Sequence, residues 1–95
     1  MPVLQIDHRV RDYDAWKAAF DSDPVGREAG GVRSHRIARP GSDPNHVLIE
    51  LEFDSTGEAE AFHQRLLGLW SSAGERLGLE SPSSRIVDVV ESATY

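Results

Sequence analysis

The stretch HVLIELEF, residues 46–53, alternates between two kinds of side chain. One set is apolar and the other is mostly polar or acidic: Val47, Ile49, Leu51 and Phe53 against His46, Leu48, Glu50 and Glu52. A period of two is typical of a β-strand that places one face on a core and turns the other away from it. We therefore expect a half-buried strand here, and it is the clearest element in the chain.

The segments on either side extend this strand into a hairpin and a helix. The six residues before it, PGSDPN (40–45), are turn formers, so residues 32–39 (VRSHRIAR) should pair with it as a strand, although they are unusually polar for a central one. After it, Ser55-Thr56-Gly57-Glu58 has the form of a capping box, in which a Ser and a Glu satisfy free backbone N–H groups. A second helix should begin there.

This helix carries an apolar stripe at helical spacing, formed by Ala59, Phe62, Leu66 and Leu69 and widened by Leu67 and Trp70. We expect a bend at Ser71-Ser72 and a short further helix to about Leu77. Residues 81–84 (SPSS) then predict a loop, and residues 85–92 (RIVDVVES) predict a last strand rich in β-branched residues.

The N-terminal third predicts a strand followed by a helix. Residues 3–10 alternate, with one face formed by Leu4, Ile6, His8 and Val10. Asp12 can cap a helix whose inner stripe is formed by Tyr13, Trp16, Ala19 and Phe20. Beyond Ser22, Asp23-Pro24 restarts a short turn that Gly30-Gly31 ends.

The resulting order is βαββαβ, which predicts one α+β domain over residues 1–95 with the ferredoxin-like arrangement of two helices on one face of a four-stranded antiparallel sheet. The other face would carry Leu48, Glu50 and Glu52, opposed by either Arg33, His35 and Ile37 or Ser34 and Arg36. If strands 3–10 and 46–53 pair in parallel, Asp7 and Arg9 also lie near these acids. That face is too charged for a dry core and too mixed for an ordinary surface.

Size and composition favour a homodimer in which a second copy covers this face. A chain of 95 residues buries only about 60 to 65% of its unfolded surface when it folds alone. Cys is absent, so disulfides cannot add stability, and association is the remaining common route.

The net charge of −6 and the dispersion of nine Arg and one Lys among sixteen acids argue against nucleic acid as a partner, because phosphate contacts need a basic face. The N-terminus has neither a basic segment nor an apolar one, and no run approaches the length that a membrane span requires. We therefore expect a cytoplasmic protein without membrane contacts.

Two motifs resemble a known superfamily. His8-x-Val10-x-Asp12-Tyr13-x-x-Trp16-Lys17 and the strand ending in Phe53-Asp54-Ser55, taken with the βαββαβ order, resemble the dimeric α/β-barrel superfamily, near its antibiotic biosynthesis monooxygenase-like and uncharacterised cyclase-like groups. The resemblance implies a homodimer whose two sheets form a barrel, with a pocket between sheet and helices or near the barrel mouth. Its members include cofactor-free monooxygenases of aromatic polyketides, polyketide cyclases and haem-degrading enzymes.

His8 is the candidate catalytic residue, because it is the polar member of an otherwise apolar strand face. There an imidazole can act as a general base or orient a carbonyl group. The alternative is a core histidine that is hydrogen-bonded within the protein. The aromatic stripe of Tyr13, Trp16 and Phe20 fits core packing directly, and Trp16 is also a candidate contact for a flat substrate.

His63 and Trp70 are candidate substrate-binding residues, since a spacing of seven places both on nearly the same side of a helix. For Trp70 the alternative is a core or dimer-contact aromatic residue. Haem-degrading relatives use an Asn on the first strand, a Trp on a helix and a His beyond it. Here the first strand has Asp7 and His8 instead of Asn, and residues 71–80 contain no His. We therefore expect no haem and no other cofactor.

Glu50 and Glu52 share a strand face and, with His46 and His35 nearby, are candidates for a metal site or an acid/base pair. The competing interpretation is that Glu50 and Glu52 form salt bridges with Arg9 and with Arg33 or Arg36. This interpretation is favoured because no tight metal motif is present. We expect no metal.

Two functions follow as hypotheses. The first is a cofactor-free oxygenase or cyclase in which His8 moves a proton and Trp70 and His63 shape a pocket for a small hydrophobic or aromatic ligand. The second is a non-catalytic binding or stress-related homodimer. A cavity beside His8 or His63 favours the first, and tight packing around both favours the second.

Overall fold

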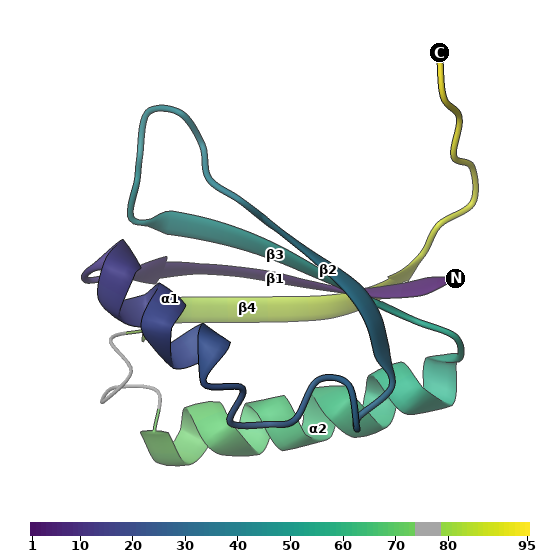
Figure 1. The fold of residues 1–95 in the computed structure, drawn as a ribbon, viewed down its shortest axis with the longest axis horizontal. Coiled ribbons are helices and arrows are strands. Elements are labelled where there is room, and N and C mark those ends of the chain that lie inside the picture. The colour runs from purple at the N-terminus through teal and green to yellow at the C-terminus, as the bar shows by residue number, and fades with distance from the viewer. Residues whose placement is uncertain (74–78) are drawn as a thin grey trace.

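The computed structural model describes residues 1–73 and 79–95 and confirms the predicted order of elements. In chain order these are β1 (Pro2–Val10), α1 (Tyr13–Asp21), β2 (Val32–Ala38), β3 (His46–Phe53), α2 (Thr56–Ala73) and β4 (Leu79–Asp88). The strands form one antiparallel sheet in the order β2-β3-β1-β4, so the fold is ferredoxin-like (Figure 1).

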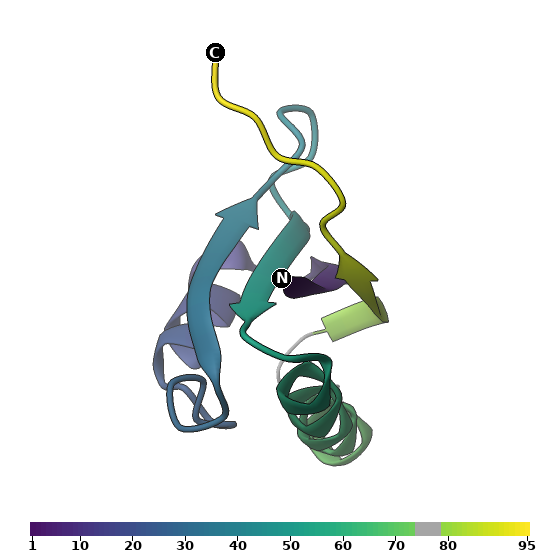
Figure 2. The ribbon, with the colours of Figure 1, turned by 90° about the vertical axis from the view of Figure 1, so that its right-hand side faces the viewer.

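The two helices cover one face of the sheet, and the core lies between these layers (Figure 2). The four apolar side chains of β3 are buried as the alternation predicted, with exposed fractions of at most 3%. They pack with residues from β1, α1 and α2: Leu4, Ile6, Val10, Trp16, Ala59 and Phe62. Within the described chain, no helix is long and apolar enough to cross a membrane.

The edge position of β2 explains its polar composition, since only one of its sides pairs with a strand. Its register places Ser34 opposite Glu52 and Arg36 opposite Glu50, which settles the alternatives for the outer face in favour of this pair. His35 and Ile37 therefore point to the helix side, where the His35 ring lies 5.3 Å from that of Phe20 and Ile37 packs on the core.

The parallel pairing of β1 and β3, considered for placing Asp7 and Arg9 near the acids, does not occur, and the antiparallel sheet expected from the sequence is confirmed. The two strands are antiparallel, and Gln5 lies opposite Glu50. This follows from the hairpin: β2 returns parallel to β1 through α1, and β3 then runs back along β2.

The last strand begins earlier in the chain than predicted, so the expectation of a loop over residues 81–84 was wrong. β4 pairs with β1 from Val10↔Leu79 to Pro2↔Asp88, and just beyond it the Val89 N–H donates to the Met1 carbonyl oxygen. Pro82 is tolerated because β4 is an edge strand and its register with β1 shifts at this point, between Asp7 and Arg9. Beyond Asp88 the chain extends away from α2 (Figure 1).

Both helices begin at the predicted caps. The Asp12 carboxylate accepts the backbone N–H of Asp14, and the Ser55 hydroxyl accepts that of Glu58. α2 continues through both serines to Ala73, and the short helix expected to about Leu77 lies outside the described residues. Leu67, assigned to the apolar stripe, is 39% exposed.

The segment between α1 and β2 crosses closely over α2, and two glycines permit the approach. A Cβ on Gly30 would lie 2.7 Å from the Phe62 ring, and one on Gly31 would lie 2.5 Å from a carboxylate oxygen of Glu58. Gly31 also has a positive φ of 97°, which disfavours other residues. This crossing brings residues 22–31 over the helix-covered face of the sheet.

Candidate functional site

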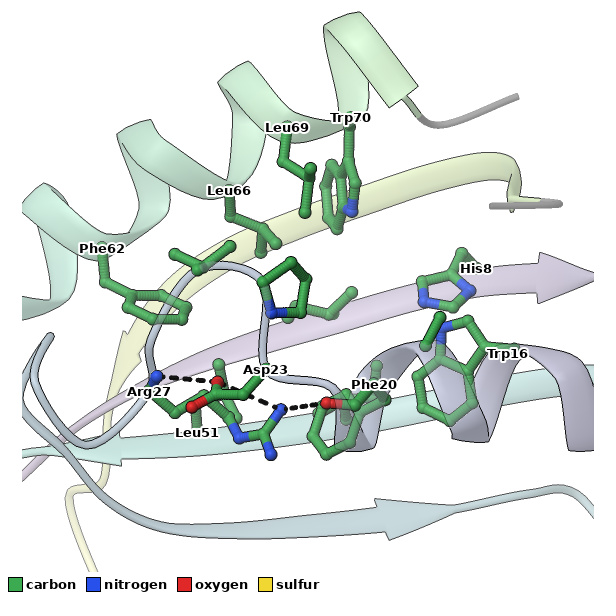
Figure 3. A pocket seen from close by; sticks show the side chains of 15 residues that line it. His8, Trp16, Phe20, Asp23, Arg27, Leu51, Phe62, Leu66, Leu69 and Trp70 are labelled. Atoms are coloured by element: carbon green, nitrogen blue, oxygen red, sulfur yellow. Dashed lines mark hydrogen bonds and ion pairs between the residues drawn. The ribbon is translucent and has the colours of Figure 1, made fainter. Parts of the chain in front are cut away.

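A cavity of about 80 Å³ lies between the sheet, α1, α2 and the segment after α1 (Figure 3). Its walls are mostly aromatic and aliphatic, and they include His8, Trp16, Phe20, Phe62, Leu66 and Trp70. Ligand pockets of drug size usually measure about 300 to 1,000 Å³. The volume therefore suits a very small ligand, and a larger one would have to move side chains.

His8 is almost fully buried at this cavity, with an exposed fraction of 2%. Its ring meets Trp16 and Trp70 edge-on, at centroid distances of 5.6 and 6.3 Å, so that one indole comes from each helix (Figure 3). Among the described residues, the His8 Nδ1 atom is the one buried side-chain polar atom without a hydrogen-bond partner. Buried polar atoms normally have a partner, so this atom is available to a ligand.

Burial lowers the pKa of His8 from 6.5 to about 4, because desolvation disfavours the charged ring. The negative charge of Asp7 acts in the opposite direction and does not offset this effect. The imidazole is therefore neutral near pH 7 and offers one donor and one acceptor.

The fold brings three of the four candidate site residues together. His8, Trp16 and Trp70 all line the cavity, whereas His63 does not. The His63 Nε2 atom instead lies 2.6 Å from the Ser84 hydroxyl of β4. The seven-residue spacing places His63 two helical turns from Trp70, which is far enough for it to face another strand.

Asp23 and Arg27 also line the cavity, and sequence reasoning did not assign them to the site. The Arg27 guanidinium lies 3.9 Å above the centre of the Phe20 ring and donates to the Phe20 carbonyl oxygen at 2.7 Å (Figure 3). Asp23 accepts the backbone N–H of Arg27 at 2.8 Å. The Asp-Pro and Gly-Gly signals had marked this segment as a turn, but a turn signal does not indicate which face of the sheet it covers.

The outer face of the sheet forms a polar network rather than a metal site. Glu50 accepts hydrogen bonds from Arg36 at 2.8 Å and from Gln5 at 3.3 Å, and Arg85 donates to Gln5 at 3.1 Å. The hydrogen bond from Arg36 lowers the pKa of Glu50. Within the described part of the chain, no cluster of His, Asp and Glu could hold a metal ion.

The other charged residues considered for this face are paired elsewhere. His46 lies 2.6 Å from the Asp7 carboxylate. Arg9 pairs with Asp43, and Arg33 pairs with Asp54. The salt-bridged interpretation of Glu50 therefore holds through Arg36, not through Arg9 or Arg33.

No protein-family model matches the chain, and no curated protein is similar to it in sequence. Solved structures do share its fold. A candidate antibiotic biosynthesis monooxygenase from Deinococcus radiodurans superposes with a TM-score of 0.67 at 16% identity, covering 100% of this chain and 98% of that one. A dimeric ferredoxin-like protein from an uncultured marine organism gives 0.63 at 13% identity, covering 99% and 98%.

A mutant of MhuD with two manganese protoporphyrin IX molecules bound per active site gives a TM-score of 0.65 at 13% identity, with 100% of both chains covered. At these identities the similarity concerns the fold alone. The ferredoxin-like fold and its likeness to antibiotic biosynthesis monooxygenase-like structures, both expected from the sequence, are confirmed at that level.

Proposed function

We propose that this protein binds a small aromatic molecule in the cavity beside His8, as a homodimer with one such site in each subunit. The observation that carries the proposal is the buried His8 Nδ1 atom, which lacks a partner although it lies next to a cavity between two indole rings. A ligand hydroxyl group would satisfy this atom, and the aromatic walls would contact the ligand ring.

The reaction that this arrangement supports best is proton removal from the bound ligand, as in a cofactor-free monooxygenase or cyclase. His8 would accept the proton through a ring nitrogen, and Trp16 and Trp70 would hold the substrate ring in place. Exclusion of water by the apolar walls would strengthen the hydrogen bond to His8.

The lowered pKa of His8 favours the second candidate, a binding protein without catalysis. A general base works best when its pKa lies near the working pH, and a value of about 4 makes His8 a weak base near neutrality. On this alternative His8 only accepts a hydrogen bond from the ligand, and the chemistry of the ligand is unchanged.

The dimer is supported by the outer face of the sheet and by the dimeric ferredoxin-like protein of the same fold. Leu48, 36% exposed, lies on this face next to the network around Glu50. Packing two such faces together would cover Leu48 and keep the charged groups paired. Light scattering should give twice the mass of the chain, and a stable monomer at micromolar concentration would contradict the dimer.

The similarity to the MhuD structure raises haem as a candidate ligand, but haem does not fit the cavity. A volume of about 80 Å³ is far below what a porphyrin occupies. His8, which would be the iron ligand in this cavity, is enclosed between Trp16 and Trp70. The proposed function therefore involves no haem.

Phenol and toluene test the binding site, because they share a ring and differ in the hydroxyl group. The wild type should bind phenol more tightly than toluene. The His8→Phe variant should bind phenol only as tightly as it binds toluene. His63→Ala is the matched control, since His63 lies outside the cavity, and it should leave both affinities unchanged. Equal affinity of the wild type for the two probes would contradict the role of His8.

Catalysis is tested separately with hydroquinone. An oxygenase should raise oxygen uptake above the uncatalysed rate, and His8→Phe should remove the increase. Tight binding of phenol together with an uncatalysed rate of oxygen uptake would favour the binding protein over the oxygenase.

A further inference from the structure

Asp23 and Arg27 form a wall shared by two hollows. On one side is the cavity of about 80 Å³ beside His8, and on the other is a more open cleft of about 400 Å³. Glu28, Arg33 and His35 line the outer cleft and not the inner cavity. A molecule placed in the inner cavity with one end toward the outer cleft would therefore contact these two charged side chains.

Arg27 keeps hydrogen-bonding capacity in this position. Its Nη1 atom donates to the Phe20 carbonyl oxygen, whereas Nε and Nη2 make no hydrogen bond to any described residue. Its side chain is only 19% exposed, and the Phe20 ring holds the guanidinium from one side. A guanidinium has five N–H donors, so Arg27 can donate to an acceptor oxygen without losing a present contact.

Asp23 balances the charge of Arg27. Its carboxylate lies 3.6 Å from Nη1 of Arg27 and accepts the backbone N–H of the same residue. His8 is neutral near pH 7, so the inner cavity has no unbalanced positive charge. A carboxylate brought into this cavity would meet the charge of Asp23 without a net cation to offset its desolvation.

We propose that Arg27 and Asp23 select uncharged ligands: Arg27 donates to a carbonyl oxygen of a single-ring aromatic compound, and Asp23 disfavours the corresponding carboxylate. The inference rests on the proposed binding site beside His8 and names the class of ligand that this site takes. The small cavity limits the ligand to one ring, and the shared wall places the carbonyl group toward the outer cleft.

Three single-ring probes test the cavity, the Arg27 donors and the Asp23 charge in turn: toluene, benzamide and benzoate. Titration would be followed by the indole N–H signals of Trp16 and Trp70, the two tryptophans of the chain, in proton–nitrogen correlation spectra. The wild type should bind benzamide about tenfold more tightly than toluene, through the donors of Arg27, and should bind benzoate more weakly than benzamide.

Two variants test the charged pair. Arg27→Met should lower the affinity for benzamide about tenfold, to that of toluene. Asp23→Asn should raise the affinity for benzoate above that for benzamide, because the guanidinium then acts as an unbalanced cation. Asn retains an acceptor oxygen for the Arg27 backbone and tolerates the positive φ of 57° at this position.

Arg39→Met is the matched control, since Arg39 also stacks on an aromatic ring of α1, with its guanidinium 4.2 Å above Tyr13, but lies outside the cavity. It should leave all three affinities unchanged. Toluene binding with equal affinities for benzamide and benzoate in the wild type and in Asp23→Asn would overturn the inference and leave the proposed site intact. Failure of all three probes to shift either indole signal would overturn both.

Discussion

The two faces of the sheet differ in whether their polar groups have hydrogen-bond partners. On the helix-covered face His8 is buried without a partner for Nδ1, and burial is the main cause that lowers its pKa. On the outer face Glu50 is partly exposed and bonded to Arg36 and Gln5, and the pKa of its carboxyl group is lowered mainly by the first of these partners. A polar group that is hydrogen-bonded within the protein stabilises the fold, whereas a buried polar group without a partner is available to bind a ligand.

Leucine truncation on each face should show the largest difference between them. Leu51→Ala removes a side chain that is 2% exposed and should lower the free energy of unfolding by about 2 to 5 kcal/mol, through lost burial and the cavity left behind. Leu48→Ala, on the outer face, should cost well under about 1 kcal/mol if the unfolding unit is a monomer. Urea denaturation measures both.

A large loss from Leu48→Ala that depends on protein concentration would show that a second copy covers the outer face. Equal and small losses from both variants would contradict the assignment of the core to the helix-covered face.

The protonation of His8 should give the next largest change in the free energy of unfolding. Because its pKa is about 4 in the folded chain and 6.5 in the unfolded chain, the unfolded state binds a proton first as the pH falls. The stability that His8 contributes is present above pH 6.5 and is lost between about pH 6.5 and pH 4, and its size is about 3 kcal/mol. Urea denaturation midpoints across this range measure the loss.

His8→Phe should flatten this pH dependence, whereas His63→Ala should leave it in place. A wild-type stability that is constant between pH 6.5 and pH 4 would mean that His8 titrates normally in the folded chain, and hence that water reaches its ring.

Breaking the Arg36–Glu50 ion pair of the outer face should give the smallest change in the free energy of unfolding. Arg36→Met leaves Glu50 without its strongest partner. In the separate subunit both side chains are more than a third exposed, so the free energy of unfolding of a monomer should fall by less than about 1 kcal/mol. The loss should shrink further at high salt. Thermal denaturation at two salt concentrations measures it, with Arg39→Met as a control.

A loss of about 3 kcal/mol or more from Arg36→Met would be expected only for a buried ion pair. That result would place the outer face inside an interface, as in the proposed dimer.

Local patterns predicted much of the fold. The alternation in β3 correctly identified its buried side chains, and Asp12 and Ser55 marked the starts of both helices. The last strand was misplaced because SPSS has the composition of a loop, and only the pairing with β1 shows that an edge strand with a shifted register accepts Pro82.

The candidate site was predictable only in part. His8 stood out because a polar residue interrupts an apolar strand face, and Trp16 and Trp70 because they are large aromatic residues on inner helix faces. Arg27 and Asp23 gave no such signal, since a charged residue in a turn is ordinary. Their place at the cavity depends on where residues 22–31 cross α2.

The sequence by itself determined the order of the elements, the apolar faces of β1 and β3 and the caps of both helices, because these depend on residues close together in the chain. Only the tertiary structure decided that His8 meets one indole from each helix, that His63 faces β4 instead, and that Asp23 and Arg27 line the cavity. The physical reason is that these contacts depend on strand register and on how the helices and the loop cross the sheet, which no local pattern encodes.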